Sequence, residues 1–310
     1  MERTLRGKTV FISGGSRGIG LAIALRAARD GANITIAAKT TSAHPTLPGT
    51  IYTAAEQIEA AGGKALAVCC DVRDEMDVES AIARTVERFG GLDVCVNNAS
   101  AVRLTTILET PMKRFDLLHQ VNARATFMVT QKALPHLLQS ANPHVLTISP
   151  PLLLEEHWLS PHVGYSMAKF GMSMVVLGTA GEFRGRVGVN ALWPRTAIDT
   201  AAMAEFEGHM TVGVLRSAEI MADAAYLVLT SDGTTNTGRF LIDDEVLAEH
   251  GVTDLEQYGP PGVDDIDLMP DLFVQSLREL RGRDSLGNAD GPADDEQCQN
   301  SGAERGHWFP

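Results

Sequence analysis

The sequence has few cysteines, and their arrangement fits neither a disulfide framework nor a metal site. Four occur among 310 residues. Cys69 and Cys70 are neighbours whose side chains would point to opposite faces of a strand, and no metal-ligand spacing is present. We therefore expect free thiols, no bound metal and a reducing compartment, which favours a cytoplasmic location.

Positive charge and long apolar runs are also scarce. Lys and Arg number 26 against 39 Asp and Glu, which gives a formal net charge of −13. This excess of negative charge argues against nucleic acid or an anionic membrane surface as a partner. No apolar stretch is long enough for a membrane span, and the first residues lack the apolar run of a signal peptide.

Short apolar runs alternate with helical patterns along most of the chain, which is typical of βαβ units. We expect an α/β fold: a single-domain Rossmann-type doubly wound parallel sheet of about seven strands with helices on both faces. The expected strands are Thr9–Ser13, Asn33–Ala38, Ala65–Cys69, Leu92–Val96, His144–Ser149, Val187–Leu192 and Arg239–Ile242. Helical patterns lie near residues 18–30, 52–61, 75–89, 111–139, 162–183 and 217–230.

Composition changes after the last expected strand. Residues 1–243 are predicted to form the dinucleotide-binding and catalytic domain. Residues 244–280 are predicted to be an extension packed on or near it, with a helix over Asp271–Leu280. Gly, Asp, Asn, Gln and Ser dominate residues 281–310, which predicts a disordered acidic tail.

A glycine-rich turn follows the first strand and opens a helix. Glycine permits a tight turn and a close approach of the backbone to a pyrophosphate, and the helix start offers unpaired N–H groups to the anion. A lone turn of this kind is weak support for a nucleotide site, but its place between a strand and a helix strengthens it. The predicted cofactor-binding residues of the turn are Gly14, Ser16, Arg17, Gly18, Ile19 and Gly20.

The end of the second strand indicates which nucleotide binds. An NAD site usually has a carboxylate there for the ribose 2′-hydroxyl, but this chain has Ala38 followed by Lys39. A cation suits a 2′-phosphate, and Arg17 could add a second one, so NADP is favoured over NAD. The alternative is that Lys39 is only a solvated lysine at a strand end. Asp71 and Val72, just after the third strand, are placed to contact the adenine.

With three further motifs, the chain resembles the short-chain dehydrogenase/reductase family over roughly residues 7–243. The motifs are the run from Asn97 to Ser100, Asn122 in the following helix, and Tyr165-x3-Lys169. Segments such as ISPPLLL and NALWPRTAIDTAAM resemble the hydroxysteroid dehydrogenase-like protein 2 group of that family. Members of the group that have a sterol-carrier domain carry it C-terminally, and we expect none in this chain.

The resemblance implies hydride transfer between a nicotinamide cofactor and an alcohol or ketone. In the family the Tyr is the acid/base, the Lys biases its pKa and binds the ribose, and the Asn holds a water in a proton relay. The implied catalytic residues are Tyr165, Lys169, Asn122 and Ser149. Further cofactor contacts are implied for Tyr165, Lys169, Asn98, Ala99, Pro194, Thr196 and Ile198.

Two departures from the family pattern keep a second function open. The family's catalytic Ser lies about 13 residues before the Tyr, where this chain has Leu152, and Ser149 is the substitute candidate. The usual Pro-Gly after the sixth strand is Pro194-Arg195. The alternative is a nucleotide-binding protein with weak or no catalysis that acts as a sensor or scaffold.

The substrate and partners are less well defined. Trp158 and Trp193 could line an apolar pocket or anchor the core, whereas His157 and His162 are interpreted as loop residues. The apolar lid residues Met203, Ala204 and Phe206 favour a lipid-like small-molecule substrate. The helix near 162–183 is apolar around most of its circumference, which favours a homodimer or homotetramer.

Overall fold

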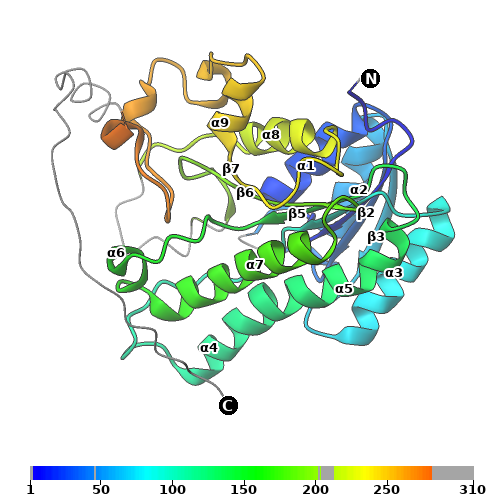
Figure 1. Ribbon diagram of the computed structural model, residues 1–310, viewed down its shortest axis with the longest axis horizontal. Helices are drawn as coiled ribbons and strands as arrows, with labels where there is room; N and C mark the ends of the chain where they lie inside the picture. Colours follow the sequence, from blue (N-terminus) through cyan, green and yellow to red (C-terminus); the bar gives the residue numbers. More distant parts are fainter. Residues whose placement is uncertain (1–2, 45–46, 202, 204–212, 281–310) are drawn as a thin grey trace, which may run out of the picture.

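A single parallel sheet runs through the centre of the protein, as the sequence predicts. The computed structural model describes residues 3–44, 47–201, 203 and 213–280 (Figure 1). The strand order is β3-β2-β1-β4-β5-β6-β7, so the α/β doubly wound fold is confirmed. The strands are β1 Thr9–Ser13, β2 Asn33–Ala38, β3 Lys64–Cys69, β4 Val94–Asn97, β5 His144–Ile148, β6 Gly188–Trp193 and β7 Phe240–Ile242.

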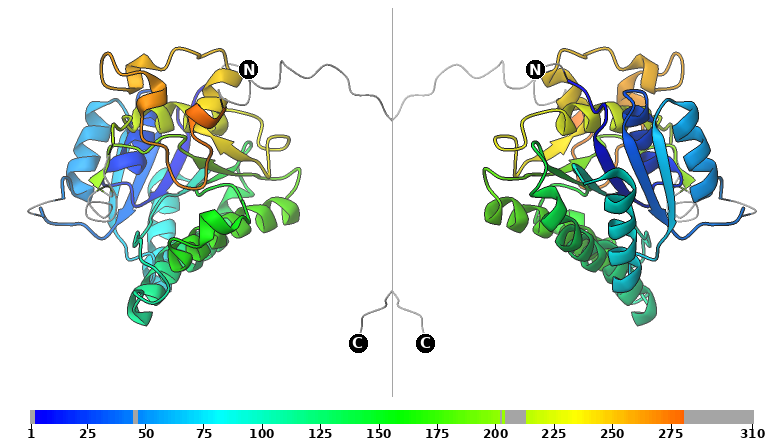
Figure 2. Two further views of the ribbon diagram at one scale, coloured as in Figure 1. Left: turned by 90° about the vertical axis from the view of Figure 1, so that its left-hand side faces the viewer. Right: turned by 90° about the vertical axis from the view of Figure 1, so that its right-hand side faces the viewer.

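Helices cover both faces of this sheet, which gives three layers (Figure 2). Helices α1, α2 and α8 share one apolar core with the sheet, α3 and α5 share the other, and α7 contributes to both. In β1, Val10 and Ile12 face the first core and Phe11 the second, because successive strand side chains point to opposite faces. The helices are α1 Gly18–Ala28, α2 Ile51–Ala60, α3 Glu75–Phe89, α4 Met112–His119, α5 Ala125–Leu137, α6 Glu156–Leu159, α7 Val163–Glu182, α8 Glu219–Leu229 and α9 Asp243–Glu249.

The sheet order predicts a binding crevice between β1 and β4. From β1 the chain builds outward through β2 to β3, and it then returns to add β4 on the other side of β1. At such a switch point the connections leave in opposite directions, which opens a crevice beyond the carboxyl ends of the strands. The glycine turn follows β1, and the run that begins at Asn97 follows β4, so both border this crevice.

The helix expected over residues 111–139 is interrupted. Helices α4 and α5 are joined by a π-helical turn, η1, over Gln120–Arg124. Asn122 is fully buried within it. A π-turn inserts a residue into the helix and breaks the regular hydrogen-bond ladder, and such turns are frequent at functional sites. Residue periodicity did not indicate this interruption.

The segment after β7 packs against the sheet domain and returns to its carboxyl edge. It contains α9 and two short 3-10 helices, η3 Glu256–Tyr258 and η4 Asp265–Asp267. The Tyr258 hydroxyl donates to Asp223 Oδ2 of α8 at 2.7 Å. The helix predicted over Asp271–Leu280 is wrong in its first half, where the chain is a loop and helix begins only at residue 277. The predicted tail, residues 281–310, lies outside the described residues, and the domain boundaries remain predictions.

Candidate active site

The glycine turn has the shape that a pyrophosphate cradle needs. Gly14 and Gly18 have φ of 69° and 56°, in the left-handed region that favours glycine. A Cβ on Gly14 would lie 2.8 Å from Ala99 Cα, and one on Gly20 would lie 2.5 Å from Asn98 Nδ2. Helix α1 begins with no side-chain cap and no acidic residue in its first turn. Its first N–H groups are therefore available to an anion, which fits a dinucleotide.

Asn98 holds this turn in place. Its Nδ2 donates to Ser13 O at 3.1 Å and to Gly14 O at 2.9 Å. The Ser13 hydroxyl oxygen in turn accepts the backbone N–H groups of Asn98 and Ala99. The side-chain NH2 group of Asn98 is thus used to hold the glycine turn. Ser16 is buried, and Ile19 packs against the core below the turn.

The place where the adenosine ribose is predicted to bind, beyond the end of β2, is a cluster of opposite charges. Asp71 accepts a two-point hydrogen bond from Arg73 and lies 3.7 Å from Lys39 Nζ. These hydrogen bonds, and then the charge of Lys39, lower the pKa of Asp71 to about 2. Arg17 donates from Nη2 to Gly49 O, and its buried Nε has no partner in the described structure. Arg73, which the sequence interpretation missed, stands two residues after Asp71.

Tyr165 and Lys169 lie one turn apart on α7 and are both buried, with 4% and 2% of their surfaces exposed. Lys169 Nζ donates to Ile148 O at 2.8 Å and lies 4.6 Å from the centre of the Trp193 ring. Burial lowers the pKa of Lys169 to about 7, against the opposing effect of the Asp271 carboxylate. Burial, reinforced by Asp271, raises the pKa of Tyr165. Tyr165 is therefore a neutral phenol at physiological pH and can donate a proton.

Asn122 joins the loop after β4 to the π-turn. Its Oδ1 accepts the Ala101 N–H at 2.8 Å, and its Nδ2 donates to Ala101 O at 3.0 Å. Both ends of the amide are therefore engaged. The water relay stays a prediction, because neither end of the Asn122 side-chain amide is left free to hold that water.

Ser149 is placed at the site, whereas Leu152, at the family's usual serine position, packs against the core. Ser149 follows Ile148, whose carbonyl accepts from Lys169. The Ser149 side chain is buried, and its hydroxyl has no partner among the described residues. A buried hydroxyl without a partner is costly, so this oxygen is suited to contact a substrate.

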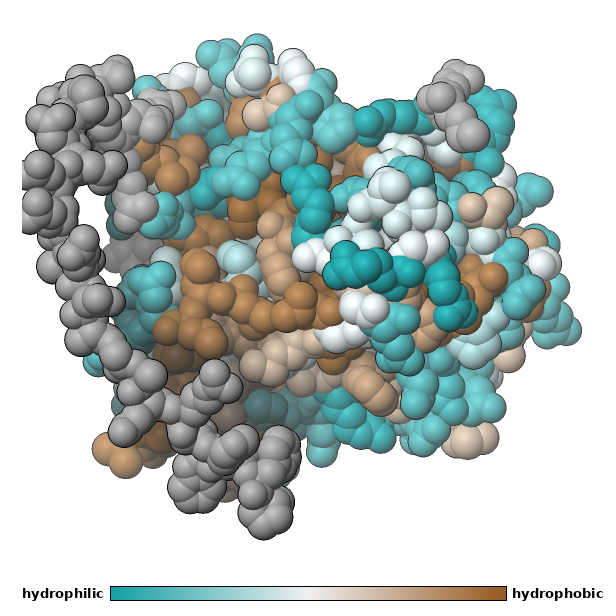
Figure 3. All heavy atoms as spheres, viewed as in Figure 1, coloured by the Kyte–Doolittle hydropathy of each residue, from teal (hydrophilic) through white to brown (hydrophobic). Residues whose placement is uncertain are grey.

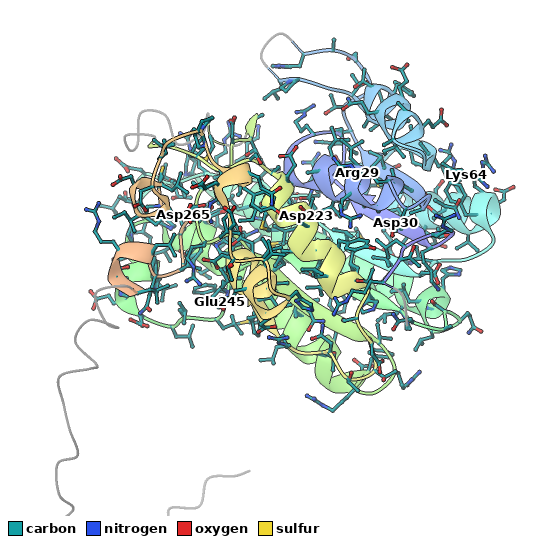
Figure 4. All side chains as sticks on the ribbon, turned by 90° about the horizontal axis from the view of Figure 1, so that it is seen from above. Arg29, Asp30, Lys64, Asp223, Glu245 and Asp265 are labelled. Atoms are coloured by element: carbon teal, nitrogen blue, oxygen red, sulfur yellow. The ribbon has the colours of Figure 1, made fainter. Side chains whose placement is uncertain are left out.

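Arg195 replaces the glycine of the family's Pro-Gly and ties the segment from Pro194 to the start of α9. Its guanidinium pairs with Asp244 at 3.0 Å and with Glu245, which Figure 4 labels on α9. The Arg195 backbone N–H donates to Asp243 Oδ1 at 2.8 Å. Two other predicted cofactor residues in this segment, Thr196 and Ile198, are buried, and the Thr196 hydroxyl has no partner among the described residues.

Asp243 should make the folded state less stable as pH rises. Burial raises its pKa to about 7, so between about pH 4 and 7 the folded state retains a proton that the unfolded state has lost. The free energy of unfolding should fall over this range by up to a few kcal/mol, on the order of 1.4 kcal/mol for each pH unit between the folded and unfolded pKa values. Burial also raises the pKa of Asp271 to about 7, so in urea titrations at pH 5 and 7.5 Asp243→Asn should reduce this fall, and Asp271 should account for what remains.

The control for this prediction is Asp254→Asn, because Asp254 is an exposed aspartate in the same C-terminal segment. It should keep the wild-type slope of stability against pH. An unchanged slope in Asp243→Asn would show that another group titrates.

The histidines and tryptophans near Tyr165 separate into surface and site residues. His157 is exposed and lies 3.6 Å from Glu155, but it belongs to the short helix α6, so the loop interpretation is wrong for it. His162 lies in the loop before α7, as interpreted, but it is buried, and its ring centre lies 5.8 Å from that of Tyr165. Trp158 and Trp193 both pack against Phe273 of the C-terminal segment. Of the proposed lid residues, Ala204 and Phe206 lie outside the described residues, whereas Met203 is half-buried.

Some other sequence expectations bear on the site. Cys69, Cys70 and Cys95 are free. Within the described ranges, no group of His, Cys, Asp or Glu is arranged to hold a metal ion, and no helix there is long and apolar enough to cross a membrane. The cytoplasmic location stays a prediction.

The short chain dehydrogenase family matches residues 8–210, which is more than half of the chain. Together with the parallel sheet, the glycine cradle and the Tyr-Lys pair, this match shows that the chain belongs to the short-chain dehydrogenase/reductase family. The fold and site thus define a dehydrogenase of the Rossmann type.

The resemblance to one group of that family is also confirmed. Hydroxysteroid dehydrogenase-like protein 2 of Danio rerio is 53% identical over 276 residues, which cover 89% of this chain and 66% of that protein. The chain thus spans about two thirds of that relative's length. A solved protein of Xanthomonas campestris, assigned as a dehydrogenase, is 56% identical with a TM-score of 0.85, covering 88% of this chain and all of that one. A short chain dehydrogenase of Burkholderia cenocepacia in complex with NADP is 29% identical with a TM-score of 0.65, covering 78% and 97%.

Proposed function

We propose that the protein is an NADP-dependent oxidoreductase that interconverts a ketone and an alcohol, with Tyr165 as the acid/base. The observation that carries this proposal is the buried pair of Tyr165 and Lys169 at the same edge of the sheet as the glycine cradle. The nicotinamide, when bound, supplies or accepts the hydride. The protein's own task is to position the substrate and to move one proton.

The protonation of the site favours the reducing direction. Tyr165 enters as a neutral phenol, so it can donate its proton to the carbonyl oxygen as negative charge develops there. The Lys169 ammonium then stabilises the phenolate that remains. The Ser149 hydroxyl, which is buried without a partner among the described residues, donates a second hydrogen bond to the same oxygen.

Turnover of a panel of ketones with NADPH tests this function. Reduction of any member supports it. Binding of NADPH, seen as quenching of tryptophan fluorescence, without reduction of any ketone would instead favour the sensor or scaffold. That second candidate rests on Leu152 at the usual serine position.

Replacing Lys39 should change the cofactor preference. Lys39→Asp should weaken NADP by roughly tenfold to a hundredfold, the scale of one lost hydrogen bond to a charged group of about 1.5–3 kcal/mol. NAD, which lacks the 2′-phosphate, should be spared, so the ratio of the two Michaelis constants is the measurement. The NADP complex of the Burkholderia relative supports this choice of cofactor.

Lys64→Asp is the matched control, because Lys64 is an exposed lysine at the opposite, amino end of β3. It introduces the same change of charge and should leave the ratio of Michaelis constants unchanged. An equal ratio in wild type and Lys39→Asp would remove the assignment of the 2′-phosphate contact to Lys39.

The outer faces of α5 and α7 are expected to bind a second copy of the chain. Figure 3 shows apolar side chains gathered over α7, and Phe127, Met167, Met174 and Leu177 are each about half exposed. Leu177→Glu should halve the mass measured by light scattering, because a buried unpaired charge opposes association. Met76→Glu, on α3 and 72% exposed, should not. A wild-type monomer at micromolar concentration would contradict this interface.

A further inference from the structure

The C-terminal segment Leu268–Val274, here called the strap, lies along the edge of the active site. Its backbone is held by Ala197, whose N–H donates to Met269 O at 2.8 Å. Farther along, Trp193 Nε1 donates to Leu272 O at 2.7 Å. The strap is thus attached to the end of β6 and to the segment predicted to contact the nicotinamide.

The strap inserts one phenyl ring beside the catalytic tyrosine. Phe273 has none of its surface exposed, and its ring is stacked on that of Tyr165, 6.2 Å away at an interplanar angle of 28°. The other rings around it, with centroid distances, are Phe170 at 5.1 Å, His162 at 5.9 Å, and Trp158 and Trp193 at 6.2 Å each. The ring therefore fills an aromatic box that opens onto Tyr165.

The backbone at Phe273 is in an unfavourable conformation. Its φ is 65°, and it is the only non-glycine residue in the described ranges whose φ is positive. A bulky side chain at positive φ is strained, and such strain persists only where the surroundings enforce it. The packing of the ring in the aromatic box and the hydrogen bond from Trp193 hold the backbone in this strained conformation.

Two buried polar atoms in the segment between the end of β5 and the start of α7 have no partner among the described residues. They are Ser149 Oγ and His162 Nε2. Each belongs to a residue with less than one tenth of its surface exposed. Unpartnered buried polar groups are rare and point to a missing ligand or to strain. Burial lowers the pKa of His162, so its neutral imidazole can donate or accept a hydrogen bond to a substrate.

We propose that Phe273 occupies the apolar half of the substrate site and that a planar, ring-bearing ketone or alcohol replaces it between the tryptophan and tyrosine rings. This inference rests on the proposed function and names the substrate class for it. Displacing Phe273 relieves the strained backbone, and the oxygen of the incoming molecule can pair with Ser149 or His162. Phe273 thereby determines specificity, because a ligand without a planar face gains too little from the box to displace the ring.

Phe273→Gly tests this inference directly, since glycine keeps the positive φ while it removes the ring. The probe is 2-naphthol, a planar two-ring phenol, titrated calorimetrically into the 310-residue chain saturated with NADP. We expect binding at least tenfold tighter than in wild type, because no ring has to be displaced. Phe273→Leu should give a smaller gain. Phe11→Leu, an equally buried phenylalanine in the other core, should give none.

Two outcomes would overturn the proposal. The first is that Phe273→Gly binds 2-naphthol no more tightly than wild type does. The second is that Phe273→Gly binds benzene but not 2-naphthol, which would mark an engineered cavity of phenyl size only. The titration involves no turnover, so it remains decisive if the wild type reduces no ketone. Failure of the wild type to reduce any ketone would reject the proposed function. Tighter binding of 2-naphthol by Phe273→Gly would still identify the aromatic box as a ligand site.

Discussion

Replacing Tyr165 with phenylalanine is expected to lower kcat by roughly 10²–10⁴, the usual range for the loss of a positioned general acid. The change removes only the hydroxyl, so the stacking of the ring on Phe273 and its packing in the core should persist. Cofactor affinity should change little, because the glycine turn and the charged residues Lys39, Asp71 and Arg73 are untouched. The measurement is single-turnover reduction of a ketone with NADPH, alongside a fluorescence titration of the cofactor.

Tyr258→Phe is the matched control for this loss. Tyr258 is also buried, but its hydroxyl donates to Asp223 on α8 and takes no part in the proposed active site. Its removal should cost about 1.5–3 kcal/mol of stability, the scale of one hydrogen bond to a charged group, and leave kcat unchanged. If Tyr165→Phe kept wild-type turnover, the proton would have to come from another group, and the buried imidazole of His162 would be the first to examine.

The parts of the site that the sequence predicted are those that depend on local structure. The glycine turn needs only a strand, left-handed glycines and a helix start, all within residues 9–28. Tyr165 and Lys169 share a face because they are four residues apart on one helix. The order of βαβ units then brings both to the carboxyl edge of the sheet, since parallel strands have their ends at the same side.

The parts that the sequence did not predict depend on contacts between distant segments. Phe273 reaches Tyr165 across more than a hundred residues, and burial of its ring overrides the helical pattern in which it lies. His162 lies in a loop, and its burial depends in part on the ring of Phe273 in the distant strap. Arg195 marks a departure from the family in the sequence, but its partners on α9 become visible only in three dimensions.

Lys169→Met tests whether the charge of Lys169 stabilises the phenolate of Tyr165, because it keeps the length of the side chain but removes its charge. If the Cβ spacing of residues one turn apart, about 5–6 Å, is taken as the charge separation, a cation stabilises a phenolate by about 3 kcal/mol at an effective dielectric constant of about 20. That energy corresponds to a rise of about 2 in the pKa of Tyr165 and about a hundredfold in rate. The pH profile of kcat should accordingly move upward, and the Michaelis constant for the cofactor should rise.

Stability distinguishes this effect from simple misfolding. Burial lowers the pKa of Lys169 to about 7, so between about pH 7 and 10 the unfolded state binds the proton that the folded state lacks, and wild-type stability should rise with pH. Lys169→Met should lack this rise and should be no less stable than wild type at pH 6, although it is far less active. Lys169→Arg, which keeps the charge, should recover part of the rate, and Lys132→Met, on the surface of α5 and paired with Glu75 and Glu79, should retain all of it. A Lys169→Met variant with the wild-type pH profile would show that Tyr165 does not depend on this cation.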